Sequence, residues 1–311
     1  MNATINRYAY AFIDTLPHGQ LAFHAADRGV RWTGTIDDIE RVPPELLLHK
    51  AVYLRVLSDF PRITNLSMRL TTIADAPAGS GLGTSSTLVV AMIQAMQEYL
   101  GLPLGEYEIA QLAYEVERKD CDLAGGRQDH YAAAFGGFNL MDFMPDGRVI
   151  VNPLRLHAST ICELESSLVL YFTGVSRESA HIIEEQRQHV ERGDAAAVEA
   201  AHAVKAQVNP MKEALLRGDL RGLSASLHAS WEAKRAMATQ ISNDGIDRIY
   251  NEARRAGALA GKISGAGGGG FMMLMVDPMR RVDVLETLKH LGGQIYPCSF
   301  QNAGATAWRP Q

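Results

Sequence analysis

Apolar and polar residues alternate through three stretches near the start of the chain, and this pattern predicts β-strands. They lie at residues 7–16 (RYAYAFIDTL), 20–32 (QLAFHAADRGVRW) and 65–75 (NLSMRLTTIAD). Later, mostly apolar stretches predict further strands at 167–174, 271–277 and 293–300. Helical patterns separate these strands, so the chain is predicted to form mixed layers of the α+β or α/β kind.

The helical stretches differ in how much of their circumference is apolar. From Leu88 to Leu100 nearly every face is apolar, which predicts a helix enclosed by its own domain and ended by Gly101 and Pro103. Over residues 107–119 the apolar positions instead form one stripe. Further helices are predicted over 175–186, where Ser176 suits the N-cap position, onward to about 256, and over 280–291.

Length and composition are those of an ordinary globular protein. The 311 residues are 47% hydrophobic and 21% charged, which is enough to bury a core and long enough for two domains. We expect the boundary between Pro153 and Thr160, which gives domains of residues 1–157 and 158–311. Because the sequence opens inside a strand pattern, we also expect residues to be missing upstream of Met1.

Charge, cysteine content and hydropathy narrow the class of protein. A formal net charge of −5 argues against nucleic acid as a partner, since phosphate backbones bind basic surfaces. Cys121, Cys162 and Cys298 are odd in number and lack metal-site spacing, which indicates reduced thiols in a cytoplasmic protein. No apolar run reaches the roughly 18 residues that a membrane helix needs, so no membrane partner is expected.

Glycines at alternate positions precede the long apolar helix, in DAPAGSGLGTSSTLVV (residues 75–90). Gly79, Gly81 and Gly83 free the backbone to approach a ligand, and the hydroxyl residues Thr84–Ser86 follow at once. Unpaired N–H groups at a helix start bind phosphate, and hydroxyls can bind phosphate or Mg²⁺. The alternative is a tight turn into a helix that Ser or Thr caps. Neither GxxxxGK[ST] nor the dinucleotide fingerprint fits this loop, so a phosphate site here belongs to another class.

A second glycine loop, KISGAGGGGF (residues 262–271), lies between a predicted helix and a predicted strand. Its five glycines indicate that a ligand or another backbone segment approaches closely. Flexibility alone is the alternative, at a high entropic cost beside an apolar strand.

One carboxylate stands where the helical pattern predicts an apolar residue. The helical spacing of the apolar stripe predicts an apolar residue at position 117, one turn after Ala113, but the chain has Glu117 there. An inward carboxylate needs a metal, a cation or a cluster of hydrogen-bond donors. A buried salt bridge with Arg118 or Lys119 is the alternative to a functional role.

A second carboxylate, Asp129, lies twelve residues later in AGGRQDHYAAAFGGF (residues 124–138). A helix cap is the alternative for this aspartate. Two glycine loops and two such acids together suggest a magnesium nucleotide and phosphoryl transfer. That reaction needs backbone donors for the phosphates, an acid that holds the metal and a base that faces the acceptor hydroxyl.

Both loops resemble motifs of a known family. PAGSGLGTSSTL (residues 77–88) resembles the second motif of the GHMP small-molecule kinases, and KISGAGGGGF resembles their third, in the family's order. More narrowly, residues 120–143 and 170–186 are similar to bacterial D-glycero-D-manno-heptose 7-phosphate kinases. The similarity runs over essentially the whole chain.

The resemblance implies an α+β, two-domain GHMP kinase fold, with an N-terminal domain like domain 2 of ribosomal protein S5 and a ferredoxin-like C-terminal domain. It implies ATP and Mg²⁺ as cofactors. The implied ATP-binding residues are Pro77, Gly79, Ser80, Gly81, Leu82, Gly83, Thr84, Ser85, Ser86, Gly265, Ala266, Gly267 and Gly268, in loops that extend to Gly270. Ser85 and Glu117 would hold Mg²⁺, and Asp129 would face the acceptor hydroxyl as base or charge stabiliser. The implied sugar-phosphate contacts are Gly126, Arg127, Gly174 and Arg177.

Two departures from the family's pattern bear on function. The family's first motif, R-x-P-x-R…G-G-G-T-D, is absent, and NATINRYAYAF resembles the strand that follows it. The subfamily usually has D-Q-Y where this chain has Asp129, His130 and Tyr131. His130 therefore either replaces a glutamine hydrogen bond or titrates near neutral pH.

The resemblance thus predicts an ATP-dependent sugar kinase that phosphorylates the anomeric hydroxyl of D-glycero-D-manno-heptose 7-phosphate. The 1,7-bisphosphate would serve nucleotide-heptose and surface-polysaccharide synthesis. The alternatives are another GHMP sugar kinase, for fucose or an unphosphorylated heptose, and a non-catalytic sugar-nucleotide sensor. A homodimer is compatible with the sequence, which does not decide the oligomeric state.

Overall fold

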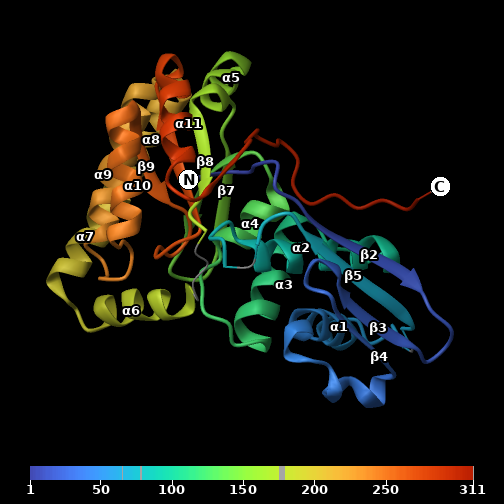
Figure 1. Ribbon diagram of the computed structural model, residues 1–311. Helices are drawn as coiled ribbons and strands as arrows, with labels where there is room; N and C mark the ends of the chain where they lie inside the picture. The colour runs from blue at the N-terminus through green and yellow to red at the C-terminus, as the bar shows by residue number, and fades with distance from the viewer. Residues whose placement is uncertain (65, 78, 175–178, 311) are drawn as a thin grey trace. The chain divides into compact units, whose positions relative to one another are not determined.

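The protein is described by a computed structural model over residues 1–64, 66–77, 79–174 and 179–310, and it divides into two compact units (Figure 1). Unit 1 comprises Met1–Asn6, Ala78–Leu82 and Phe138–Gln301, and unit 2 comprises Arg7–Pro77, Gly83–Gly137 and Asn302–Gln311. These units are not the two predicted sequence domains, because residues 138–157 precede the predicted boundary and lie in unit 1. The domains 1–157 and 158–311 stay a prediction.

Unit 2 contains a four-stranded mixed sheet in the order β2-β5-β3-β4. Its strands are β2 (Ala9–Thr15), β3 (Leu21–Ala25), β4 (Val30–Gly34) and β5 (Met68–Ala74). β3 runs parallel to β5, and the other neighbours are antiparallel. The single strand predicted over 20–32 is wrong, because a short 3₁₀ turn (Ala26–Arg28) and Gly29, at φ +67°, reverse the chain between β3 and β4.

The helices of unit 2 include the two that the sequence singled out. They are α1 (Leu47–Asp59), α2 (Thr84–Leu100), α3 (Glu106–Glu115) and α4 (Gln128–Phe135), with 3₁₀ segments at Ile36–Arg41 and Pro44–Leu46. α2 ends at the predicted Gly101, whose backbone is left-handed, but it already begins at Thr84. α3 passes into a π-helical turn, η4 (Val116–Asp120), in which the Cys121 N–H donates to the Val116 carbonyl.

The larger sheet of unit 1 has the order β11-β8-β10-β9, and all its neighbours are antiparallel. Its strands are β8 (Leu168–Phe172), β9 (Ala258–Ile263), β10 (Phe271–Val276) and β11 (Gln294–Tyr296). Helices connect β8 to β9 and β10 to β11, while β9 and β10 form a hairpin. This βαββαβ order is the predicted ferredoxin-like topology.

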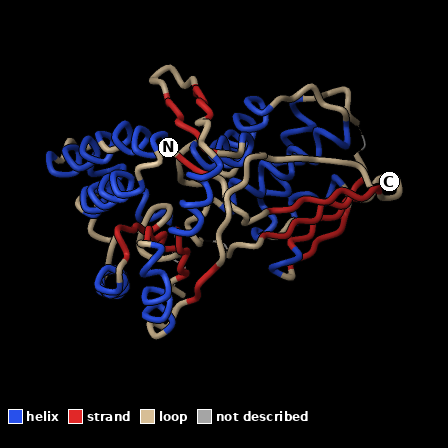
Figure 2. Tube along the Cα trace, turned by 90° about the horizontal axis from the view of Figure 1, so that it is seen from above, coloured by secondary structure: helices blue, strands red, loops and turns tan. Residues whose placement is uncertain are grey.

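Unit 1 also contains a small sheet in the order β1-β6-β7, and the strands of all three sheets are red in Figure 2. Its strands are β1 (Asn2–Ala3), β6 (Phe138–Phe143) and β7 (Val149–Pro153). The remaining elements of unit 1 are α5 (Ala158–Ser167), α6 (Ser179–Glu191), α7 (Ala195–Ala206), α8 (Val208–Arg217), α9 (Leu220–Arg235), α10 (Asp244–Ala256), the 3₁₀ turn Pro278–Arg280 and α11 (Arg281–Lys289). The predicted N-cap Ser176 lies outside the described residues.

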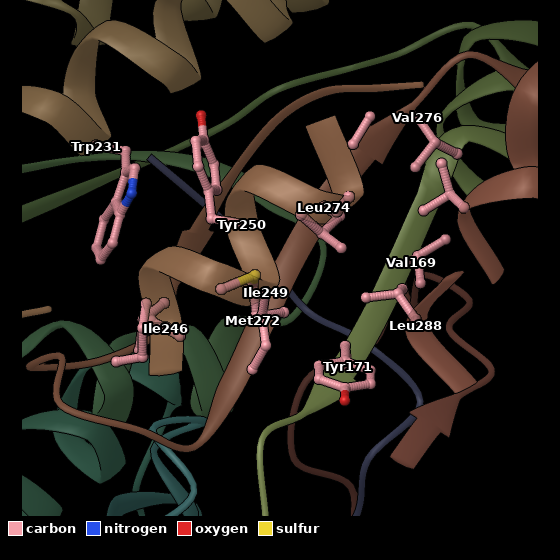
Figure 3. Close-up of a cluster of buried hydrophobic side chains, with 14 of the residues drawn as sticks. Val169, Tyr171, Trp231, Ile246, Ile249, Tyr250, Met272, Leu274, Val276 and Leu288 are labelled. Carbon is pink, nitrogen blue, oxygen red and sulfur yellow. The ribbon is translucent and has the colours of Figure 1, made fainter. Parts of the chain in front are cut away.

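An apolar cluster joins the helices of unit 1 to its larger sheet (Figure 3). Trp231 of α9 and Tyr250 of α10 lie on the side of the helices, and Met272 of β10 and Tyr171 of β8 come from the strands. All four side chains are buried. Burying a large apolar side chain contributes about 1.5–3 kcal/mol, so this cluster is a main source of stability for the unit.

Within the described residues, no helix has both the length and the apolar character that a membrane crossing requires. No disulfide joins Cys121, Cys162 or Cys298, all of which are described.

Candidate active site

The start of α2 is built on a glycine in unit 2. Gly83 is the N-cap residue with left-handed backbone, φ +71° and ψ +27°, and among the described residues no side chain caps the helix there. The hydroxyl of Thr87 donates instead to the Gly83 carbonyl at 2.9 Å, inside the first turn. A cap by Ser or Thr, the alternative for this loop, is therefore not what the structure has. Uncapped N–H groups at a helix N-terminus favour an anion.

Glu117, on the π-turn η4, is hydrogen-bonded to the first turn of α2. Its side chain is 1% exposed and accepts hydrogen bonds on both oxygens. Oε1 accepts from the Ser85 hydroxyl at 2.6 Å, and Oε2 accepts from the Ser86 hydroxyl at 2.6 Å. His130 Nε2 also lies 2.6 Å from Oε2, and Arg118 Nη2 lies 3.4 Å from it. The inward position that the helical stripe predicted for this glutamate is confirmed.

These partners keep Glu117 ionised despite its burial. Burial alone raises the pKa of a carboxyl group, but the hydrogen bonds from His130, Ser85 and Ser86 and the charge of Arg118 outweigh it. Together they lower the pKa of Glu117 to about 2, from an ordinary value of 4.5. The sequence left a metal, a cation or a donor cluster as the partner, and the structure supplies the last two.

Asp129, in the first turn of α4, has the opposite environment. Its side chain accepts no hydrogen bond within the described part of the chain. It packs against the start of α2, because a Cβ atom placed on Gly83 would lie 2.8 Å from the Asp129 Cγ. Removal of its carboxyl group from water by the surrounding protein raises the pKa of Asp129. The nearby Glu117 carboxylate adds to this rise, although the charges of His130 and Arg118 oppose it.

The two carboxylates are thus suited to different work. Glu117, which hydrogen bonds keep ionised, can hold a cation. Asp129, which accepts no hydrogen bond from the described protein and has a raised pKa, can accept a proton. Hydroxyl and carboxylate oxygens are the hard ligands that Mg²⁺ takes, usually with phosphate and water in its other positions. Ser85, which is exposed, and Glu117 therefore fit the donor set of a Mg²⁺ ion that arrives with a nucleotide.

Arg118 fixes the loop between η4 and α4. Its guanidinium donates to the carbonyls of Leu123 (3.2 Å), Ala124 (2.9 Å) and Gly126 (3.4 Å). A Cβ atom on Gly125 would lie 2.5 Å from the Arg118 Cζ, so the loop passes very close to this side chain. The arginine that holds the loop thus also contacts Glu117.

Gly126 and Arg127, two predicted sugar-phosphate contacts, directly precede α4, whose first turn holds Asp129. The Arg127 guanidinium lies over the ring of Tyr114, 4.5 Å from its centroid, in a cation–π arrangement. A Cβ atom on Gly126 would meet nothing within 4 Å, so the backbone there is open. Both residues therefore accompany Asp129 in unit 2.

In unit 1 the two glycine loops fit against each other. The Phe271 N–H donates to the Ser80 carbonyl at 2.9 Å. A Cβ atom on Gly270 would lie 2.2 Å from that carbonyl oxygen, and one on Gly81 would lie 2.5 Å from the Ser264 oxygen. Both glycines also have positive φ, +85° and +81°. Close approach of another backbone segment, one of the alternatives for the second loop, is therefore found.

Side chains of neighbouring helices hold the second loop as well. Lys234 Nζ donates to the Gly265 carbonyl, and Gln186 Nε2 donates to the Ala266 carbonyl at 3.2 Å. Burial, and to a smaller extent the charge of Lys262, lowers the pKa of Lys234 to about 7. The loop is thus anchored at several points, which argues against plain flexibility.

The predicted site residues are distributed over both units. Unit 1 holds Gly79, Ser80, Gly81, Leu82, Gly174, Gly265, Ala266, Gly267 and Gly268. Unit 2 holds Pro77, Gly83, Thr84, Ser85, Ser86, Glu117, Gly126, Arg127 and Asp129, and there the structure brings Ser85, Ser86 and Glu117 together and Gly83 against Asp129. Ser80 is fully buried, and Gly174, at φ +78°, has open space around it. Arg177 lies outside the described residues.

His130 was noted from the sequence only as a departure from the D-Q-Y pattern, with no partner assigned. For Arg118, the salt bridge with Glu117 that stood as an alternative is confirmed, with 3.4 Å between Nη2 and Oε2. In the structure both side chains contact the same oxygen of Glu117, Oε2. The available signal was their closeness to the two acids in the sequence, which does not indicate which atoms meet.

Comparison with known proteins identifies the family. Residues 47–137 match the GHMP kinases N-terminal domain, and residues 211–293 match the GHMP kinases C-terminal domain. The chain is 43% identical to a D-glycero-alpha-D-manno-heptose 7-phosphate kinase of Campylobacter jejuni, over 99% of this chain and 90% of the relative.

Solved structures agree in fold. A D-glycero-D-manno-heptose 1-phosphate kinase from Bacteroides thetaiotaomicron has a TM-score of 0.81 and 40% identity, covering 99% of this chain and 89% of the other. Lactococcus lactis galactokinase has a TM-score of 0.77 over 98% of this chain and 88% of its own, at 16% identity, which supports the fold alone. The chain therefore belongs to the GHMP kinase family and has the family's two-domain fold, as predicted.

Proposed function

We propose that this kinase transfers the γ-phosphoryl group of ATP to the anomeric hydroxyl of D-glycero-D-manno-heptose 7-phosphate. The bond between the γ-phosphorus and the β–γ bridging oxygen breaks, a bond to the sugar O1 forms, and ADP and the 1,7-bisphosphate leave. The hydroxyl proton passes to Asp129. We place the reaction in the cytoplasm, where ATP is available.

One observation carries the catalytic part of this proposal. The Asp129 carboxylate has no hydrogen-bond partner in the described structure, its pKa is raised, and it packs on Gly83 at the uncapped start of α2. A proton acceptor thus stands beside the helix end that favours the phosphates of ATP. Positioning of this kind supplies much of the rate of phosphoryl transfer.

Ser85 and Glu117 would hold Mg²⁺, whose oxygen-ligand chemistry their side chains fit. When bound, the ion neutralises charge on the phosphates. The chain's own contribution is to keep Glu117 ionised and oriented, through its hydrogen bonds to Ser85, Ser86 and His130.

The choice of acceptor rests on the relatives that are about 40% identical over nearly the whole chain, both named for D-glycero-D-manno-heptose phosphates. Arg127, two residues before Asp129 at the N-cap of α4, offers a guanidinium near the proton acceptor in the sequence. An arginine can bind a phosphate through two parallel hydrogen bonds. Gly126, Gly174 and Arg177 complete the proposed sugar-phosphate contacts.

The catalytic proposal is tested with Asp129→Asn, assayed by ADP release with heptose 7-phosphate. Loss of a general base costs typically 10²- to 10⁴-fold, so kcat should fall by about that factor while ATP binding by calorimetry is retained. Asp122→Asn is the matched control, because Asp122 lies in the loop that leads to α4, is exposed and has φ +52°, which asparagine also tolerates. Near-normal turnover by Asp129→Asn would remove this residue from its role.

The acceptor is tested separately with a panel of sugars. Heptose 7-phosphate should give the highest kcat/KM among heptose 7-phosphate, heptose 1-phosphate, free heptose and L-fucose. Heptose 1-phosphate is included because the Bacteroides thetaiotaomicron relative carries that name. A higher kcat/KM for a free sugar would show that the proposed acceptor is wrong, while the protein would still be a kinase. Binding of ATP and sugar with no ADP formed at any magnesium concentration would instead support the sensor.

A further inference from the structure

The two carboxylate oxygens of Glu117 have unequal environments. Among the described residues, Oε1 has one hydrogen-bond donor, the exposed Ser85. Oε2 has two donors at 2.6 Å, the Ser86 hydroxyl and His130 Nε2, with Arg118 Nη2 at 3.4 Å. One oxygen is therefore anchored in the interior, and the other faces the residue that would share a metal with it.

Within the described residues, the side chain of His130 makes one hydrogen bond, which is to the anchored oxygen, Oε2. Its side chain is fully buried, and because an ionised carboxylate only accepts, Nε2 carries the proton of this hydrogen bond. Nδ1 has no hydrogen-bond partner in the part of the chain that is described. The ring of Tyr114 meets the imidazole edge-on, with centroids 5.9 Å apart and planes at 90°. An apolar ring would fill this space without a buried, unpaired nitrogen, so packing alone does not account for a histidine here.

The same hydrogen bond links two elements of the site. His130 directly follows Asp129 in α4, whereas Glu117 belongs to η4. The other donors to Oε2 do not make this link, because Ser86 lies on α2 and Arg118 lies on η4 itself. His130 thus fixes the first turn of α4, which carries the proton acceptor, against the acid that would hold the metal.

We propose that His130 is a positioning residue for divalent-cation binding: it holds Oε2 of Glu117 so that Oε1, together with the Ser85 hydroxyl, is presented to Mg²⁺. This rests on the proposed function, in which Ser85 and Glu117 are the protein ligands. Groups that orient a metal ligand by hydrogen bonding are often worth 10- to 100-fold in metal affinity or activity.

The test compares His130→Phe, which keeps an aromatic ring and removes the donor, with His130→Gln, which keeps an N–H donor. His49→Phe is the matched control, because His49 is another buried histidine of unit 2 and its side-chain hydrogen bond is to Thr72 and not to Glu117. Two quantities are measured at constant pH. One is the Mg²⁺ concentration for half-maximal ADP release. The other is Mn²⁺ binding by electron paramagnetic resonance in the presence of a non-hydrolysable ATP analogue.

His130→Phe should raise the half-maximal Mg²⁺ concentration and the Mn²⁺ dissociation constant about 10- to 100-fold, with a smaller loss of kcat at saturating metal. His130→Gln should restore most of the affinity, and His49→Phe should leave it at the wild-type value. Wild-type metal binding by His130→Phe would overturn the proposal. So would equal weakening by the Phe and Gln variants, because the lost ring and not the donor would then be responsible.

The proposal stays testable if one variant does not fold. Should circular dichroism show His130→Phe unfolded, His130→Met replaces it, because methionine adapts to irregular apolar spaces and donates no hydrogen bond. Failure of the proposed function is distinguishable, since wild-type protein would then form no ADP with the sugar. The Mn²⁺ measurement would still decide the role of His130.

Discussion

Gly83 and Gly101 flank helix α2, and both have left-handed backbone, at φ +71° and +66°. A Cβ atom on Gly101 would meet nothing within 4 Å. On Gly83 it would lie 2.8 Å from Cγ of Asp129 and 2.9 Å from its Cβ. Alanine at either position therefore strains the backbone to the same degree, but only Gly83→Ala displaces the carboxylate.

The expected magnitudes follow from these contacts. A left-handed conformation costs an alanine about 1–2 kcal/mol, partly offset by a stiffer unfolded chain, so each variant should lose about 1 kcal/mol in free energy of unfolding. Carbon atoms rest about 3.5–4.0 Å apart, so Asp129 must retreat by roughly 1 Å in Gly83→Ala. Turning the carboxylate does not relieve this contact, because it includes the Asp129 Cβ. A misplacement of that size costs about 100-fold in rate.

We therefore expect kcat for heptose 7-phosphate to fall about 100-fold in Gly83→Ala and to stay within about twofold of wild type in Gly101→Ala. ADP release at saturating substrates measures the rates, and urea unfolding measures the two stabilities. The reasoning fails if both variants unfold at the same urea concentration and also turn over at similar rates. Asp129 would then not need its place against Gly83.

Three further predictions concern pH and packing. Burial lowers the pKa of His49 to about 4 from 6.5, so its stabilising effect is complete above pH 6.5 and is lost as the pH falls towards 4. The free energy of unfolding should fall by about 3 kcal/mol over this range. Urea unfolding should show that it depends less on pH in His49→Gln than in the wild type. Because the pKa of Asp129 is raised, the acid limb of kcat should lie above pH 3.8, and a limb at or below that value contradicts its role as base. Gly270→Ala places a Cβ 2.2 Å from the Ser80 oxygen, so it should lose at least about 2 kcal/mol more stability in urea than Gly292→Ala, whose φ is similar (+85° and +82°) and whose surroundings are open.

The residues of the candidate site could be predicted where each of them breaks a local rule. Glu117 interrupts an apolar helical stripe, and Gly83 precedes a helix with no capping side chain of its own. Asp129 follows a glycine-rich loop. Such conflicts with local pattern are visible in the sequence, and the family motifs then suggested a role for each residue.

The contacts between these residues could not be predicted. His130 meets Glu117 through the way α4 packs against η4, and Ser80 meets Phe271 through the packing of segments that are distant in the chain. For the second glycine loop the sequence left ligand approach, backbone approach and flexibility open, and only the folded positions of Ser80, Lys234 and Gln186 show the backbone approach and the anchoring. Likewise, the alternation over residues 20–32 fits one long strand as well as a hairpin, because the reversal depends on a short turn, Ala26–Arg28, and on Gly29, which interrupt the pattern only briefly.

The π-turn at Val116–Asp120 has a consequence for how negative charge is distributed. In a regular α-helix, positions three apart are neighbours on one face, so Glu117 and Asp120 would point the same way. The wider turn separates them. Glu117 enters the interior, and Asp120 reaches the partly exposed guanidinium of Arg55 on α1, with contacts of 2.7 and 2.8 Å. The π-turn thus gives two acids that are only three positions apart separate sets of hydrogen-bond donors, so they do not compete for the same ones.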